Sequence, residues 1–284
     1  MDFLKNVVYI IVKRPFVILF FALIILILAL IGDYIPIFTI LSGLSSITNA
    51  SIFESIISYL QFMLDPGIIP MLLAFLLLFT IAAAGIAGLV FSGYFNILNN
   101  AVAAGKKAKG EYLSGLRKYS IRVSLISARV TVFGFLFIIF MLVASVPSIV
   151  ISRAAATDKP ELLAAAIFVD ILTAGIIFFG LMFFRLYMLY WYPAAINNSG
   201  KYFSIGKQTV DRKFWSLTGR FVIFDAVYIL FQFLFTLIKD PSVNLIVNWL
   251  FRTCFFTCFV IYIFYSYRKY SGINGTGSMK RARV

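Results

Sequence analysis

Long apolar stretches alternate with short polar connections along the chain, and this alternation is its main structural signal. The stretches predict six membrane-spanning helices, at about residues 16–34, 68–99, 124–151, 162–192, 217–238 and 244–267. A helix needs about 20 apolar residues to cross the hydrocarbon core of a bilayer. The predicted fold class is therefore an all-α, polytopic integral membrane helical bundle, organised as a single membrane domain.

Two segments near the beginning of the chain have the spacing of amphipathic helices. Residues 1–14 place apolar positions between basic ones and predict a short lead-in helix at the membrane surface. Residues 44–64 repeat apolar positions at helical spacing without any Lys or Arg, which predicts a helix on the outer leaflet, with a re-entrant gate as the alternative. The apolar stretch between them could also be a signal-peptide core, but no small-residue cleavage pattern precedes Gly32, which favours a span.

The composition excludes several classes of protein. The 284 residues are 62% hydrophobic and 13% charged, and a soluble domain of this length could not bury so much apolar surface. The chain has no His, which excludes His-ligated metal sites and His-dependent catalytic triads. Cys254 and Cys258 lie four residues apart in an apolar helix, where packing is the expected role. The acids do not form a catalytic pair, and no nucleotide-binding motif occurs, so we expect no enzyme activity, cofactor or metal.

Lys and Arg concentrate on one side of the predicted topology. They occur in the N-terminal segment, in the loops 101–122 and 193–216, and in a flexible basic tail at 271–284. The positive-inside rule therefore predicts that both termini are cytoplasmic, in a cytoplasmic membrane. The net charge of +14 then lies where anionic lipid headgroups are expected, and nucleic acid is not needed to explain it. The candidates for headgroup or partner docking are Lys106, Lys107, Lys109, Arg117, Lys118, Lys201, Lys207, Arg212 and Lys213.

Residues 98–118 and 192–213 share a pattern that predicts an internal repeat. In each, a span ends in small residues, a Gly-Lys step follows, and an aromatic-apolar-Ser segment ends in Gly before a basic run. We interpret them as two duplicated hairpins, each with a short amphipathic cytoplasmic helix, at 112–122 and 202–213. Repeats of this kind are common in transporters, and they also arise by duplication in scaffolds.

Five ionisable residues lie inside the predicted spans, where a charge is costly and calls for a partner. Arg129, Arg185 and Asp225 are predicted at one level of the inner leaflet, and Asp170 and Arg252 near the outer leaflet. We favour snorkelling side chains and structural ion pairs as the explanation. The alternative is two charged gates that bracket a central path, the inner one suited to an anionic group.

The stretch 191–220 also carries a family resemblance. An aromatic residue precedes Pro193 and Ala194 at the end of a span, Gly200 follows, and Trp215 precedes the next span. This resembles six-span bacterial membrane proteins of unknown function and the membrane domain that precedes some glycerophosphodiester phosphodiesterases. Gln208 and the following Thr stand where that pattern has Lys/Arg-Ser. The resemblance implies membrane residence and lipid or envelope association, and it carries no active site, because the catalytic domain of those enzymes uses His.

Two functions fit these patterns. The first is a permease-like or transporter subunit without its own ATPase, supported by the long spans, the repeat and the layered charges. A separate ATPase or another membrane subunit would then dock on the cytoplasmic helices. The alternative is a lipid-interacting membrane scaffold or assembly factor, whose basic loops bind headgroups and whose intramembrane charges are structural.

Overall fold

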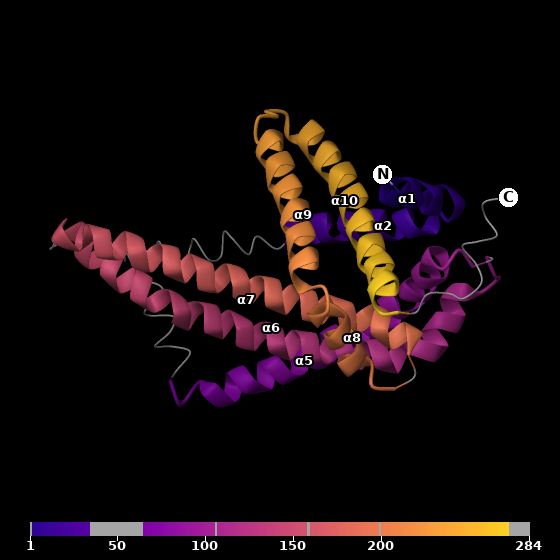
Figure 1. The fold of residues 1–284 in the computed structure, drawn as a ribbon, viewed down its shortest axis with the longest axis horizontal. Coiled ribbons are helices and arrows are strands. Elements are labelled where there is room, and N and C mark those ends of the chain that lie inside the picture. The colour runs from indigo at the N-terminus through magenta and orange to yellow at the C-terminus, as the bar shows by residue number, and fades with distance from the viewer. Residues whose placement is uncertain (1, 35–64, 106, 158–159, 199, 273–284) are drawn as a thin grey trace. The chain divides into compact units, whose positions relative to one another are not determined.

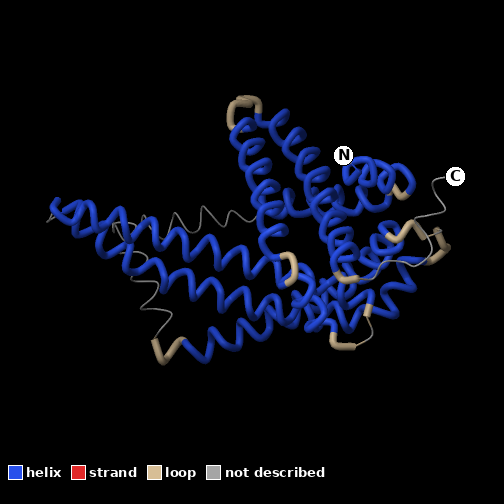
Figure 2. The backbone as a smooth tube through the Cα atoms, viewed as in Figure 1, coloured by secondary structure: helices blue, strands red, loops and turns tan. Residues whose placement is uncertain are grey.

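A computed structural model describes residues 2–34, 65–105, 107–157, 160–198 and 200–272. Every regular element in these ranges is a helix, which confirms the all-helical fold class (Figures 1 and 2). The elements are α1 (Asp2–Lys13), α2 (Phe16–Tyr34), α5 (Ile69–Val102), α6 (Glu111–Thr157), the 3-10 helix η1 (Pro160–Leu162), α7 (Leu163–Asn197), α8 (Tyr202–Asp211), α9 (Phe214–Phe235) and α10 (Pro241–Tyr270). The predicted outer helix at 44–64, most of the tail and Lys106 lie outside the described residues.

Five of the described helices, α5, α6, α7, α9 and α10, are long and apolar enough to cross a membrane. A sixth candidate is the pair α1 and α2, which bends by 86° between Lys13 and Phe16. In the most apolar window of α6 no residue is buried, and large apolar side chains remain exposed along all of these helices. Soluble proteins do not expose so much apolar surface to water. The chain is therefore a multi-pass membrane protein.

The chain divides into two compact units. Unit 1 comprises Met1–Asp33, Gly85–Ile126 and Leu186–Val284, and unit 2 comprises Tyr34–Ala84 and Ser127–Arg185. Unit 1 therefore contains α1, α8, α9, α10 and most of α2. It also contains the C-terminal ends of α5 and α7 and the N-terminal end of α6. Unit 2 contains the remaining parts of α5, α6 and α7, so these three helices run through both units.

The core of unit 1 lies where the ends of α5 and α6 meet α1, α2 and α10. The rings of Phe20 and Tyr94 stack with their centroids 4.1 Å apart, and the Tyr94 hydroxyl donates to the carbonyl of Val17 over 3.4 Å. Phe95 contacts Phe264 of α10, with 5.5 Å between ring centroids. Close packing of this kind holds helices together in a membrane, where lipid supplies no hydrophobic driving force, so this part of unit 1 is firmly packed.

Helices α9 and α10 form an antiparallel hairpin around a tight turn, as the Lys-Asp-Pro sequence predicts (Figure 1). The Asp240 carboxylate caps α10, because it accepts from the backbone N–H groups of Ser242 (2.8 Å) and Val243 (3.1 Å). Pro241 occupies the first position of α10, where no backbone donor is needed. Along the seam, aromatic rings interdigitate; those of Phe231 and Phe251 stack at 4.7 Å.

The helix that contains the predicted fourth span does not end at Tyr192 and Pro193 as the sequence predicts, because α7 continues through Pro193 to Asn197. A proline inside a helix removes one backbone hydrogen bond, and the surrounding packing compensates. The last turn is held by side chains: the Asn197 amide donates to the Pro193 carbonyl (2.8 Å), and the Asn198 amide donates to the Ala194 carbonyl (3.0 Å). The Ala194 carbonyl also accepts from the backbone N–H of Asn198 (3.0 Å), so the side-chain bonds add to the backbone bonding of this turn.

The two predicted cytoplasmic helices differ. Helix α8 is a separate short helix, as predicted. Lys201, in the left-handed conformation (φ 38°), precedes it, and Lys213, at φ −138°, separates it from α9. The segment 112–122 is not separate, because it forms the first turns of α6, which extends beyond the predicted span at both ends. Residues 116–133 contain neither Gly nor Pro, so no residue there favours a break.

Candidate functional site

The basic end of unit 1 is built around Arg14, at the elbow between α1 and α2. Its guanidinium forms an ion pair with Glu111 at 2.5 Å, and the two side chains are only 7% and 9% exposed. The same guanidinium donates to the carbonyls of Gly105 (2.9 Å) and Ile97 (3.5 Å). Arg14 therefore joins the elbow to the end of α5 and the start of α6. Sequence analysis did not single it out, although a cation directly before Pro15 is a visible signal.

Two more arginines are used in the same way. Arg122 of α6 donates to the carbonyls of Ala195 (3.4 Å) and Asn198 (3.2 Å) at the end of α7. Arg268 of α10 donates to the carbonyl of Asn99 near the end of α5 (3.1 Å). A cation at a helix C-terminus meets unpaired carbonyls and the negative end of the helix dipole. These cations stabilise the fold.

The remaining cations at this end face solvent. Eight of the nine predicted docking residues are described, and all eight are exposed: Lys107, Lys109, Arg117, Lys118, Lys201, Lys207, Arg212 and Lys213. None of them forms an ion pair with an acid in the described ranges. Their charges are therefore not neutralised by the parts of the chain that the structure describes.

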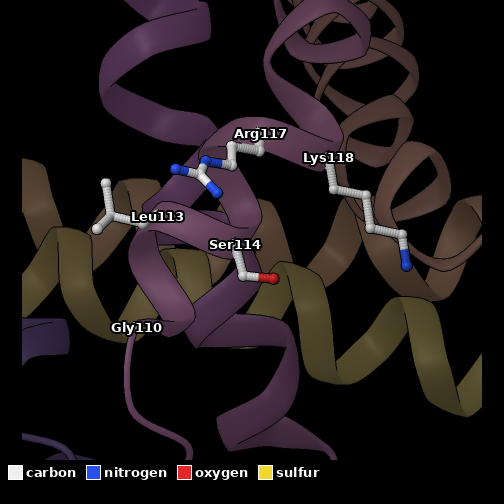
Figure 3. Close-up of a pocket in the computed structure, with 5 residues that line it drawn as sticks. All are labelled: Gly110, Leu113, Ser114, Arg117 and Lys118. Atoms are coloured by element: carbon white, nitrogen blue, oxygen red, sulfur yellow. The ribbon is translucent and has the colours of Figure 1, made fainter.

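A shallow pocket of about 490 Å³ lies over the first turns of α6, lined by Gly110, Leu113, Ser114, Arg117 and Lys118. In Figure 3 the Arg117 guanidinium extends toward Leu113, the Ser114 hydroxyl lies below it, and the Lys118 side chain extends to the other side. A guanidinium, an ammonium and a hydroxyl can together donate several hydrogen bonds to phosphate oxygens. Leu113 is 59% exposed and adds an apolar contact next to these donors.

Both copies of the predicted repeat fold back onto the span that precedes them through a glycine. A Cβ atom at Gly115 would lie 2.5 Å from the Cβ of Asn96 on α5. A Cβ atom at Gly206 would lie 3.0 Å from Cδ1 of Trp191 on α7. The copies also meet directly, because the Asn197 amide donates to Oδ1 of Asn99 over 2.9 Å. These contacts hold the basic segments close to the packed core of unit 1.

The predicted inner charge cluster draws on both units. Arg129, which is exposed, and Arg185, which is half-buried, belong to unit 2, whereas the half-buried Asp225 belongs to α9 in unit 1. Their grouping at one level stays a prediction. Asp170 in α7 accepts hydrogen bonds from two serines of α6 in its own unit, Ser148 and Ser152.

Arg252 of α10 has neutral partners in the hairpin. Its Nη2 donates to Oε1 of Gln232 on α9 (3.3 Å), and the Gln232 amide donates to Oδ1 of Asn248 (3.1 Å). The predicted placement of Arg252 and Asp170 at one level near the outer leaflet stays a prediction. Sequence analysis missed Gln232 and Asn248, although the four-residue spacing of Asn248 and Arg252 places both on one helix face.

No group of three or more His, Cys, Asp or Glu side chains that could hold a metal ion occurs among the described residues. No protein-family model, curated protein or solved structure matches the chain. The resemblance to membrane domains of phosphodiesterases therefore stays a prediction.

Proposed function

We propose that this chain is a lipid-interacting membrane scaffold whose basic end binds the phosphate groups of anionic lipids. One observation carries the proposal: the exposed cations of that end have no acidic partner among the described residues, whereas Arg14, Arg122 and Arg268 are bonded within the fold. Each exposed cation near an anionic bilayer surface contributes about 1 kcal/mol of attraction.

Helix α1 supports the proposal because it has the features of an interfacial helix. It packs Val7 and Ile10 into the core of unit 1 and leaves Val8 (60%) and Val12 (75%) exposed. Such a helix inserts its apolar side chains at the boundary between headgroups and acyl chains. We infer that the basic end lies at the cytoplasmic leaflet, where anionic lipids concentrate.

The test is lipid retention in native mass spectrometry of the full-length protein, extracted with its bilayer from vesicles that contain equal amounts of phosphatidylglycerol and phosphatidylcholine. The double variant Arg117→Gln/Lys118→Gln removes two charges from the pocket. At about 1 kcal/mol per cation, its preference for phosphatidylglycerol should fall by tenfold or more. The matched control, Arg153→Gln/Lys239→Gln, removes the same charge elsewhere and should keep the wild-type preference.

If both double variants lost the same amount of phosphatidylglycerol preference, net charge alone would explain the effect. The support for a headgroup site would then be removed. Unchanged retention in the pocket variant would contradict the proposal directly. Because the attraction is electrostatic and solvent-exposed, wild-type retention should also weaken as salt is raised.

A second candidate function is a permease-like subunit driven by a separate ATPase. The polar contacts within the spans favour it: Asp170 with two serines, and Arg252 with Gln232. For this function, Arg185→Ala or Asp225→Ala should abolish solute flux in protein that still folds and inserts. An ATPase should also be released with the chain when native mass spectrometry is applied to protein extracted, without detergent, from the membranes of the cells that produce it. Normal flux in both folded variants would exclude charged gating.

A further inference from the structure

Arg252 lies well inside α10, a helix that is long and apolar enough to cross a membrane. It lies 11 residues after Pro241, the first residue of α10, which places its backbone about 16 Å along the helix from the hairpin tip. The other end of the helix is farther still, at Tyr270. Arg stays charged under all ordinary conditions, and a charge at such a depth normally pairs with an opposite one.

Within unit 1 the Arg252 guanidinium lacks such a partner among the described residues. Its hydrogen bond goes to the neutral Gln232, and its Nε is buried without any hydrogen-bond partner. One turn above Asn248, Oδ1 of Asn244 is also buried and unsatisfied. A buried donor on a charged group that makes no hydrogen bond costs several kcal/mol at most sites, so the site is incomplete.

The chemistry and depth of the site define what would complete it. The Nε of Arg252 is buried within the hairpin, so a partner outside the chain meets the half-buried guanidinium at its Nη atoms, whose N–H groups can donate to a carboxylate. A lipid phosphate lies at the bilayer surface, about 16 Å from the Arg252 backbone. The hydrogen bond to Gln232 holds the Arg252 guanidinium at the level of the seam between α9 and α10. An acidic side chain on a neighbouring membrane helix can reach that level without deforming the bilayer.

The surface around the site suits a helix. Apolar side chains on both members of the hairpin remain exposed, among them Phe233 (64%) on α9 and Leu250 (50%) on α10. From these observations we propose that Arg252, with Gln232 and Asn248 beside it, binds the carboxylate of a transmembrane helix in a partner subunit. The carboxylate takes the free donors of the guanidinium, and the apolar faces pack around the ion pair.

The experiment uses a defined probe, a synthetic poly-leucine transmembrane peptide with one Asp placed about 11 residues from its outer end, the depth of Arg252. A peptide without the Asp is the reference. Fluorescence energy transfer measures association with the full-length protein, labelled at its C-terminal end, in phosphatidylcholine vesicles. The Asp peptide should bind about tenfold tighter than the reference, because polar contacts between membrane helices contribute about 1–2 kcal/mol.

Arg252→Gln should abolish that tenfold difference, since Gln provides a neutral polar side chain and removes the charge. Lys239→Gln, which removes a charge from the turn of the same hairpin, should retain it. Equal binding of both peptides to wild type, or tight Asp binding by Arg252→Gln, would overturn the proposal.

Two further arms separate the competing occupants. Loss of Asp-peptide binding when phosphatidylglycerol replaces phosphatidylcholine would show that an anionic lipid headgroup competes for the guanidinium, which overturns the proposal. A gain of Asp-peptide binding in Asp170→Asn would identify Asp170 of the same chain as the native partner, with the same consequence. Unchanged binding in both arms supports a partner helix.

Discussion

At the scale of single residues, the ion pair of Arg14 and Glu111 fixes the basic end. Glu111 also accepts from the backbone N–H of Ala108 at 3.0 Å, so its carboxylate holds the loop before α6 as well as the elbow. Glu111→Gln would leave the Arg14 charge buried without its counterion. Breaking a buried pair in this way costs about 3 kcal/mol or more.

Glu111→Gln should therefore lower the unfolding temperature of the protein in lipid nanodiscs, measured by intrinsic fluorescence on heating. Glu161→Gln is the matched control, since Glu161 is exposed at the 3-10 helix. An unfolding temperature for Glu111→Gln that equals that of the control would show that the pair does not hold the elbow.

The role of Arg14 illustrates which part of the site the sequence could predict. The concentration of Lys and Arg in two loops is visible in the sequence, and it correctly directed attention to the exposed cations. The sequence does not distinguish these from the structural arginines, because the partners of Arg14 lie 83 to 97 residues away. Only the fold brings together a cation, an acid and the carbonyls of a helix end.

At the scale of helices, close approach between α5 and the start of α6 depends on glycines. A Cβ atom at Gly115 would lie 2.5 Å from the Cβ of Asn96 and 3.1 Å from the Cα of Gly93, and neither atom is the flexible end of a side chain. Gly115→Ala should therefore separate the helices locally, and overpacking of this kind costs about 1–3 kcal/mol.

The same thermal unfolding measurement checks this. Gly219→Ala in α9 is the control, since nothing lies within 4 Å of a Cβ atom at that position. There the helix propensity of Ala should make the change neutral or stabilising, by up to about 1 kcal/mol. Equal stability of the two variants would mean that α5 and α6 do not depend on this close contact.

The spans themselves are predictable from the sequence because their apolar runs match the thickness of a bilayer. The residues at which the helices begin and end are less predictable. Pro193 predicts the end of a helix, but packing and the side chains of Asn197 and Asn198 carry α7 one turn further. The basic segment before the third span predicts a separate helix, but it contains no break and joins α6. Local sequence preferences yield to tertiary contacts at both places.

At the scale of the whole molecule, the chain combines a firmly packed basic end with long apolar helices that bury few of their residues within the described structure. Lipid or other membrane helices cover these apolar residues. The grouping of the intramembrane charges is a property of this scale, and the charge positions along the sequence do not determine it, since Arg129 and Asp225 belong to different units.

Both proposals require the basic end and the α9–α10 turn to lie on opposite sides of the membrane, with the basic end at the anionic inner leaflet. The most direct measurement is cysteine labelling in intact cells with a membrane-impermeant maleimide, on protein whose Cys254 and Cys258 are replaced by Ala. Lys239→Cys should react in intact cells, and Lys109→Cys should react only after the cells are permeabilised. Labelling of Lys109→Cys in intact cells would place the basic end outside and contradict the proposed headgroup site.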